Sequence, residues 1–370
     1  MLENCRWFLY ASRFYGCHPH TIDDERSRVP ANFRLPLLAY SLIMCGLYCV
    51  VGYYAKSFRD YCNTDTVTVD CVLQQGNRYN RCFYMILTPL LSCLRYAEFE
   101  RAVAVARKFD DLMRHHNSRC NDNKRMNCCM QWLIILTILV AWIVISILIM
   151  FAVPHMILYL LALQIITRIT FSMEIAKFYF LYDALYRRFR RLNGLCRKLT
   201  GMDVGIDTGI SMIHINRLTI SNLQQLYSCL IDATNHLNSY YSLQLFCWIA
   251  CMLLDIISYI FGVLRKRDNV LLTCVQCIML LIFSFQVITI SRICHLTCGQ
   301  ANALAGTMFL AKTPALKHTE FSIEAIELGV RLRIFPLRVR VCGLFNLDNS
   351  LAFSVFGIIL MYVVLTSSIH

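Results

Sequence analysis

The chain has 370 residues, of which 57% are hydrophobic and 16% are charged, and its mean hydropathy is +0.51. This composition excludes a water-soluble domain of the same length and indicates a polytopic membrane protein. The 36 Lys and Arg residues against 23 Asp and Glu give a net charge of +13. Basic cytoplasmic loops explain this charge without a nucleic-acid partner.

Long apolar runs without period-two alternation predict that the membrane-spanning elements are helices. A helix needs about 20 apolar residues to cross a hydrocarbon core about 30 Å thick, because its backbone polar groups must be satisfied internally. The second predicted span is short, contains Pro89 and ends near Arg95, so a re-entrant or interfacial segment is its alternative. In chain order, the predicted spans cover residues 35–54, 81–96, 131–153, 156–180, 240–264, 270–291 and 349–369.

The connections between these spans differ sharply in their content of Lys and Arg. The N-terminal segment and the second, fourth and sixth connections hold 25 of the 36, whereas the alternate set holds 7. The positive-inside rule therefore places the N-terminus in the cytoplasm and the C-terminus outside. We expect an all-α membrane protein with four parts: a cytoplasmic segment 1–34, six spans with cytoplasmic extensions in 35–293, a cytoplasmic anchor segment 294–348 and a last span in 349–370.

Three connections on the predicted cytoplasmic side continue the helical period beyond the membrane. Their apolar residues recur at three- and four-residue steps, which predicts helices that each bury one face. The economical arrangement is that these faces pack on one another and form an anchor through which subunits meet. Interleaved arginines also suit anionic lipid of the inner leaflet. The apolar sets are Leu185, Phe189, Leu192, Leu195 and Leu199; Leu223, Leu226, Leu230 and Leu237; and Ile323, Ile326, Val330 and Ile334, before Pro336.

The fourth predicted span carries three charged residues at membrane depth, where charge is costly and commonly functional. Glu174 and Lys177 lie three residues apart on one helix face, so we expect them to pair and to snorkel toward the cytoplasmic end. Arg168 lies deeper. It either faces a pocket or meets an acid such as Asp255 of the fifth span.

Most of the 20 cysteines fall inside spans or on the cytoplasmic side, where thiols stay reduced and behave as small hydrophobes. We interpret Cys274 and Cys277 as packing residues of the sixth span rather than as a redox or metal pair. Cys62 and Cys71 fall in an outside loop and would form a disulfide if their Cα atoms approach within about 7 Å. No P-loop, Gly-x-Ser-x-Gly or paired-carboxylate motif occurs, so we predict neither an enzyme nor a bound cofactor or metal.

The last span is uncharged and turns polar only at its end, which makes it a candidate pore wall. A ring of Leu side chains can close a narrow pore by dewetting, and polar groups at the mouth can replace part of an ion's hydration shell. Ordinary helix packing is the alternative for Tyr362 and Leu365. Asp348 directly precedes the helix and is placed to cap the N–H groups of its first turn.

The run Gly-Leu-Phe-Asn-Leu-Asp at 343–348 and the span after it resemble the C-terminal signature of insect gustatory receptors. In that family a Gly-Phe-Phe-x-Leu-Asp-like element leads into a last span that ends in Thr-Tyr, five apolar residues and Gln-Phe. This chain keeps the first element and Tyr362, but has Met361 in place of Thr, Ser368 in place of Gln and Ile369 in place of Phe.

The resemblance implies a ligand-gated, non-selective cation channel of four subunits in the plasma membrane, either identical copies or a mixture with related receptors. A small-molecule tastant would bind in the outer half of helices two to six, and the last spans would line one central pore for cations. On the family's pattern Leu365 takes the place of the hydrophobic constriction and Ser368 that of the polar Gln near the outer mouth. Tyr362 and Thr366 are the further pore-lining candidates.

Depth and side-chain type identify residues that could line the tastant site. Aromatic walls with a few polar tips suit small organic ligands, although each aromatic residue also fits an interfacial aromatic belt. The candidates are Tyr84, Trp142, Tyr159, Arg168, Tyr259 and Phe261.

A protein of another class is the alternative: a metabotropic seven-helix receptor, or a small carrier without an intrinsic pore. A G-protein-coupled receptor has its N-terminus outside, and this chain lacks both Asp-Arg-Tyr after the third span and Asn-Pro-x-x-Tyr in the seventh. A carrier should show paired half-repeats and spans broken near the midplane, and the sequence shows neither clearly.

Overall fold

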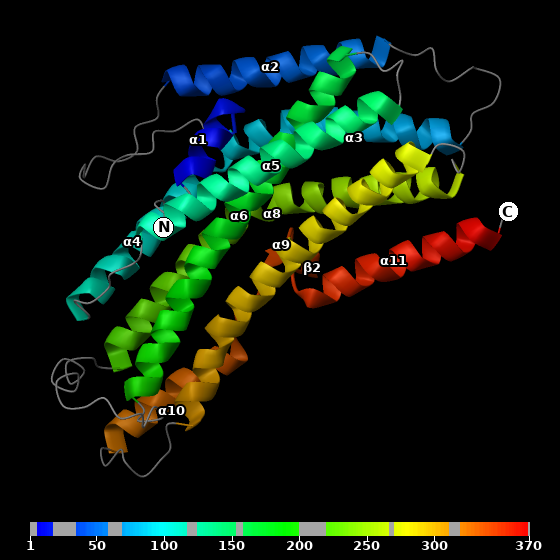
Figure 1. The fold of residues 1–370 in the computed structure, drawn as a ribbon. Helices are drawn as coiled ribbons and strands as arrows, with labels where there is room; N and C mark the ends of the chain where they lie inside the picture. Colours follow the sequence, from blue (N-terminus) through cyan, green and yellow to red (C-terminus); the bar gives the residue numbers. More distant parts are fainter. Residues whose placement is uncertain are drawn as a thin grey trace.

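The structure is a computed structural model, and its described part is almost entirely helical (Figure 1). It describes residues 6–17, 35–57, 69–116, 124–152, 158–199, 220–265, 270–310 and 319–368. Its elements are α1 Arg6–Phe14, α2 Leu35–Ser57, α3 Val69–Leu94, α4 Tyr96–His116, α5 Lys124–Ala152, α6 Leu158–Leu199, α8 Ile220–Arg265, α9 Val270–Leu310, α10 Thr319–Ile334, β1 Arg340–Val341, β2 Phe345–Asn346 and α11 Asn349–Ser368.

Seven helices overlap the seven predicted spans: α2, α3, α5, α6, α8, α9 and α11. Within the described ranges, length and apolarity alone single out Cys129–Ala152, Ser221–Leu264 and Val270–Thr307 as able to cross a membrane. The second span differs from the prediction, because α3 is one continuous helix that begins twelve residues before residue 81 and runs through Pro89. The alternative prediction of a re-entrant segment is therefore wrong. The first half of the helix was missed because residues 69–80 are too polar to be recognised by apolarity.

Three helices continue far beyond a membrane's thickness. The helices α6, α8 and α9 contain 42, 46 and 41 residues, so they are about 60 to 70 Å long, roughly twice the hydrocarbon core. Their extensions meet α4 and α10 in a second hydrophobic core, which we call the anchor core. Its members include Phe109 of α4, Phe189 and Leu192 of α6, Leu223, Leu226 and Leu230 of α8, Leu304 of α9 and Leu332 of α10.

The anchor core confirms that two of the three predicted apolar sets pack together, those of α6 and α8. In the third set Ile326 is half-buried, and the side chain of Ile323 lies outside the described residues. The prediction was wrong at the other two positions, because Val330 is 40% exposed and Ile334 is 62% exposed. Leu332 is buried instead. It lies two residues from each of them, on the opposite side of α10, so this helix is rotated by about half a turn from the predicted orientation.

The helix α4 was not predicted, although its residues contribute to both hydrophobic cores. Its low apolarity reflects a charged outer face, while its inner face buries Phe99, Ala102 and Ala106. Small alanine side chains let the backbone of α4 approach α8 closely. Arg188 of α6 also binds Asp110 of α4 through two hydrogen bonds of 2.9 and 2.5 Å. This ion pair fixes α4 against α6.

The nine-residue helix α1 packs against the inner part of α5 and α6 (Figure 1). Phe8 and Leu9 are fully buried, and the ring of Trp7 lies 4.6 Å from that of Trp132 in α5. This helix was not predicted, because residues 1–34 were interpreted as one cytoplasmic segment of mixed charge.

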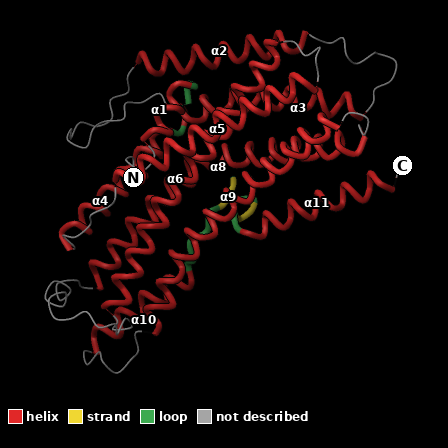
Figure 2. Tube along the Cα trace, in the orientation of Figure 1, coloured by secondary structure: helices red, strands yellow, loops and turns green. Residues whose placement is uncertain are grey.

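A two-stranded antiparallel hairpin separates α10 from α11 and departs from the all-helical expectation (Figure 2). Arg340 pairs with Asn346 and Val341 pairs with Phe345. At the turn, Cys342 and Gly343 have φ values of 49° and 73°. Positive φ at two adjacent turn residues suits the right-handed twist of a tight hairpin, and a non-glycine residue rarely adopts it.

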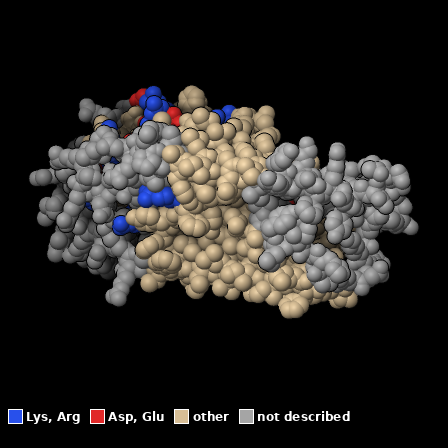
Figure 3. Space-filling view, turned by 90° about the horizontal axis from the view of Figure 1, so that it is seen from above, with Lys and Arg blue, Asp and Glu red and all other residues tan. Residues whose placement is uncertain are grey.

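Uncharged atoms cover the broad middle of the molecule, and Lys and Arg gather toward the end that carries α4 (Figure 3). Apolar side chains such as Leu136, Phe151 and Phe285 are exposed on α5 and α9. A soluble protein would not tolerate this surface, whereas lipid covers it at no cost. Cys274 and Cys277, interpreted as packing residues of the sixth span, are exposed on α9, so they do not pack within this chain and lie on its outward face.

Candidate functional site

A buried ion pair joins α6 and α8 at membrane depth. The guanidinium of Arg168 donates to both carboxylate oxygens of Asp255 at 2.5 and 3.2 Å, and both side chains are 5% exposed. Arg168 also donates to the hydroxyl of Tyr259 at 3.1 Å and lies 4.4 Å above the ring of Phe283 in α9. The pairing of Arg168 with Asp255 confirms one of the two predicted arrangements. Each partner neutralises the other where solvent cannot.

A second polar network lies one helical turn along α6. The hydroxyl of Ser172 accepts the indole N–H of Trp142 in α5 at 2.9 Å and the side-chain amide of Gln286 in α9 at 3.0 Å. Because Ser172 follows Arg168 by four residues, both networks lie on the same face of α6. Polar groups from four helices thus converge between these turns.

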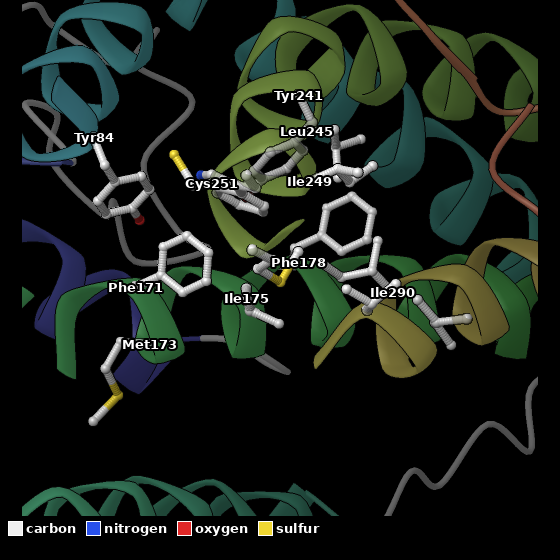
Figure 4. Close-up of a cluster of buried hydrophobic side chains, with 14 of the residues drawn as sticks. Tyr84, Phe171, Met173, Ile175, Phe178, Tyr241, Leu245, Ile249, Cys251 and Ile290 are labelled. Carbon is white, nitrogen blue, oxygen red and sulfur yellow. The ribbon is translucent and has the colours of Figure 1, made fainter. Parts of the chain in front are cut away.

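An aromatic cluster joins α3, α6 and α8, and Figure 4 shows Tyr84, Phe171 and Phe178 among its side chains. The ring of Tyr84 in α3 meets that of Phe171 edge-on at 4.7 Å. Phe171 and Phe178 of α6 approach Trp248 of α8 at 6.3 and 6.2 Å. Aromatic rings in this geometry form rigid apolar walls.

Several buried polar atoms at this site have no hydrogen-bond partner within the described residues. They are Nε of Arg168, the indole N–H of Trp248 and the amide oxygen of Gln286. An unsatisfied buried polar atom costs about 1–3 kcal/mol. Donors and acceptors that the protein leaves unpaired beside aromatic walls are what a small molecule with a hydroxyl or carbonyl group could bind.

Four of the six predicted ligand residues contribute to these networks: Tyr84, Trp142, Arg168 and Tyr259. Phe261 is half-buried two residues beyond Tyr259. Tyr159 belongs to α6, and its side chain lies outside the described part of the structure.

Sequence reasoning missed five residues of the site. On α6, Phe171 and Ser172 follow Arg168 by three and four residues, and on α9 Gln286 follows Phe283 by three. This spacing marks one face of each helix and could have pointed to them. Trp248 carries no comparable signal. The set is Phe171, Ser172, Trp248, Phe283 and Gln286.

A second buried pair on α6 lies nearer the predicted cytoplasmic end. Lys177 and Glu174 approach to 2.5 Å, which confirms their pairing, and each side chain is 1% exposed. Their predicted snorkelling was wrong, because α1 covers them. Lys177 donates to the hydroxyl of Ser12 at 2.9 Å, and that hydroxyl donates to Glu174.

The last helix, α11, begins with the predicted cap. The carboxylate of Asp348 accepts the backbone N–H of Ser350 at 3.0 Å and the hydroxyl of Ser350 at 2.5 Å. This bond satisfies one of the N–H groups that the first turn leaves free.

Only one face of the described part of α11 packs on the bundle. Val355 is 3% exposed, and Leu351 and Ile359 pack beside it against the main core. Other faces stay bare: Leu360 is 68% exposed and Phe353 is 75% exposed. The helix lies at the edge of the bundle beside α9, with the C-terminus at its far end (Figure 1).

The remaining predicted residues are only partly placed. Tyr362, Leu365, Thr366 and Ser368 belong to α11, but their side chains lie outside the described residues. The same holds for the side chain of Cys71 in α3, and Cys62 lies outside the described ranges altogether. The pore residues and the disulfide therefore stay predictions.

A family model and two solved structures that are similar to this chain are all of chemosensory receptors. Residues 6–365 match the family model described as 7tm chemosensory receptor. The structure is similar to that of the insect olfactory receptor OR5 from Machilis hrabei in complex with eugenol, with a TM-score of 0.63 and 11% identity over 99% of this chain and 97% of that chain. The same receptor in a second structure gives 0.60 and 12% over the same shares. No curated protein matches the sequence.

Proposed function

The chain belongs to the 7tm chemosensory receptor family, and we propose that it is a gustatory-type receptor of the plasma membrane that acts as a ligand-gated, non-selective cation channel. One observation carries the proposal: α11 is a 20-residue uncharged helix that packs on its own subunit along a single face. A helix of this kind at the edge of a bundle needs copies of itself, lipid or water on its other faces.

Four subunits would place the α11 helices around one axis. The exposed residues Ile358 and Met361 share one side of the helix, and Leu365 and Ser368 continue the same spacing of three and four residues in the sequence. Leu365 would then form the apolar constriction and Ser368 a hydroxyl ring at the outer mouth. Tyr362 precedes Leu365 by three residues and Thr366 follows it by one, so both would flank the constriction.

The ligand would bind among α3, α5, α6, α8 and α9, where the buried polar atoms and aromatic walls converge. Arg168 is already neutralised by Asp255, so this site favours a small uncharged tastant that offers a hydroxyl or carbonyl group rather than an ionised one. The olfactory receptor of similar fold was solved with eugenol, which supports a ligand of this size.

The helices that enclose the anchor core would hold subunits together below the membrane. The exposed apolar residues Val330, Ile334 and Phe335 at the end of α10 are available for contacts with a neighbouring subunit. The partner would be either an identical chain or a related receptor. Residues 294–348 would act as the anchor segment and residues 349–370 as the pore segment of each subunit.

Current recordings from the purified full chain in lipid bilayers, with a panel of tastants, test this function. We expect ligand-evoked cation currents and a higher resting leak after Leu365→Ala. Leu360→Ala is the matched control, because Leu360 is an exposed leucine of the same helix on another side. Binding of a tastant without current would support a metabotropic receptor instead. A leak no larger in Leu365→Ala than in the control would refute the pore assignment.

A further inference from the structure

The segment between α10 and α11 is held to the bundle at successive points. The side chain of Asn302 in α9 accepts the backbone N–H of Leu337 at 2.8 Å and donates to its carbonyl at 3.1 Å. Further along, Leu347 donates its N–H to the carbonyl of Val339 at 2.8 Å, and both side chains are buried in the main core. The hairpin is therefore bonded to the bundle rather than a loose linker.

The tip of this hairpin binds α8 through Ser242. The backbone N–H of Cys342 donates to the hydroxyl of Ser242 at 2.7 Å, and the thiol of Cys342 lies 3.6 Å from the backbone carbonyl of the same serine. Cys342 adopts its positive φ of 49° at this contact. A non-glycine residue accepts such strain when its surroundings compensate for it, and the bond to Ser242 is one such compensation.

Ser242 shares a helix with the proposed ligand site. It precedes Trp248 by six residues and Asp255 by thirteen, or about 9 and 20 Å along the axis of α8. On the other side, only six residues lie between Cys342 and Asn349, the first residue of α11. The continuous helix α8 thus carries both ligand-site residues and the Ser242 hydroxyl, which binds the hairpin that leads into α11.

We propose that Ser242 is a positioning residue that transmits movement of α8 to α11 through the hairpin turn at Cys342. This inference rests on the proposed channel function. A ligand that shifts α8 would carry the hairpin with it, because the hairpin is bonded to α8 at its tip and continues directly into α11. If the contact between Ser242 and Cys342 were purely structural, it would stabilise the fold but would not affect how strongly a bound ligand opens the channel.

The first test separates efficacy from binding. Ser242→Ala removes the acceptor of the Cys342 N–H, so we expect the gating equilibrium to fall about two- to tenfold, as for the loss of one hydrogen bond. The maximal tastant-evoked current should fall, while tastant affinity measured by direct binding stays within about twofold of the wild type. Ser242→Thr retains the hydroxyl and should restore the current. Ser239→Ala, at an exposed serine one turn earlier on α8, is the control.

The second test fixes the contact covalently. Cys247 is another free cysteine of α8 and interacts with Cys342, so the test uses a Cys247→Ala background. There S242C places a thiol opposite the native Cys342, and an added chemical oxidant would remove two electrons and two protons to form the disulfide. Because α8 and the hairpin move together in this proposal, the cross-linked channel should keep its tastant response. Current abolished by the cross-link and restored by dithiothreitol would mean that the two elements must separate, which overturns the proposal.

The failures of the two proposals are distinguishable. A wild-type chain that binds tastants but passes no current refutes the channel function itself. A conducting wild type in which Ser242→Ala and Ser239→Ala give equal maximal currents refutes only the role of Ser242. Unfolding temperatures of all variants, measured in the same lipid, show whether a loss of current follows from a loss of fold.

Discussion

The buried ion pair of Arg168 and Asp255 gives the sharpest prediction about stability. Asp255→Asn removes the negative charge and leaves the shape almost unchanged, so Arg168 keeps a charge that is 5% exposed and no longer neutralised. Breaking one partner of such a pair costs about 3–5 kcal/mol. The entropy of unfolding is about 2.1 cal/mol/K per residue in globular proteins, so over 370 residues a loss of about 4 kcal/mol lowers the unfolding temperature by about 5 °C.

Thermal unfolding in nanodiscs, followed by intrinsic tryptophan fluorescence, measures this effect, and the chain supplies its own control. Asp183 and Arg187 form a pair of 2.8 Å on the same helix, but their side chains are 16% and 41% exposed. Asp183→Asn should cost less than about 1 kcal/mol, because water screens that pair. Equal shifts for Asp255→Asn and Asp183→Asn would refute the claim that burial makes the first pair costly to break.

A paired replacement distinguishes stability from function at the same place. Arg168→Met with Asp255→Leu removes both charges, and similar pairs replaced by apolar residues are neutral or stabilising. We expect the unfolding temperature to return to within about 1 °C of the wild type, which corresponds to about 1 kcal/mol. The tastant response should not return with it if Arg168 belongs to the ligand site.

Two further predictions concern contacts near the predicted cytoplasmic side. Lys177→Met leaves Glu174 buried without its cation beneath α1, so it should destabilise the fold by about 3–5 kcal/mol, and Glu174→Leu added to it should restore the unfolding temperature. Hydrogen bonding to His236 in α8, helped by Arg101, lowers the pKa of Glu98 in α4 below its ordinary value of 4.5. The contact therefore adds stability above about pH 4.5 and loses it as the pH falls through the lowered pKa. Unfolding temperatures of the wild type should drop more steeply than those of Glu98→Gln on acidification below that value, and parallel curves would contradict the assignment.

Periodicity predicted those parts of the fold in which one helix face decides the outcome. The spans follow from apolar length, and the buried sets of α6 and α8 follow from leucines at three- and four-residue steps. The pairing of charged residues at membrane depth could also be predicted. Arg168 and Lys177 are too costly to leave unpaired in a membrane, so the sequence could anticipate an acid for each of them.

Elements whose burial depends on another part of the chain could not be predicted from the sequence. The helix α1 has only nine residues, and it is stable because α5 and α6 provide the surface that buries Phe8 and Leu9. The rotation of α10 was missed for a related reason. Val330 and Ile334 form a regular stripe, but the short helix contacts the anchor through Leu332, and periodicity cannot say which side a neighbour will cover.

The candidate site shows the same division between local and distant information. Arg168 was identifiable because a charge in an apolar run violates the local pattern, whereas Trp248 and Gln286 fit their helices well and gain meaning only from what faces them across the bundle. The hairpin tip is a further case. Nothing local to Cys342 predicts a positive φ, because the compensating hydroxyl of Ser242 lies one hundred residues earlier in the chain. The contact therefore joins distant residues at a strained position, between the proposed ligand site on α8 and the proposed pore helix α11. Such a contact is stronger evidence of function than any sequence motif in residues 335–348.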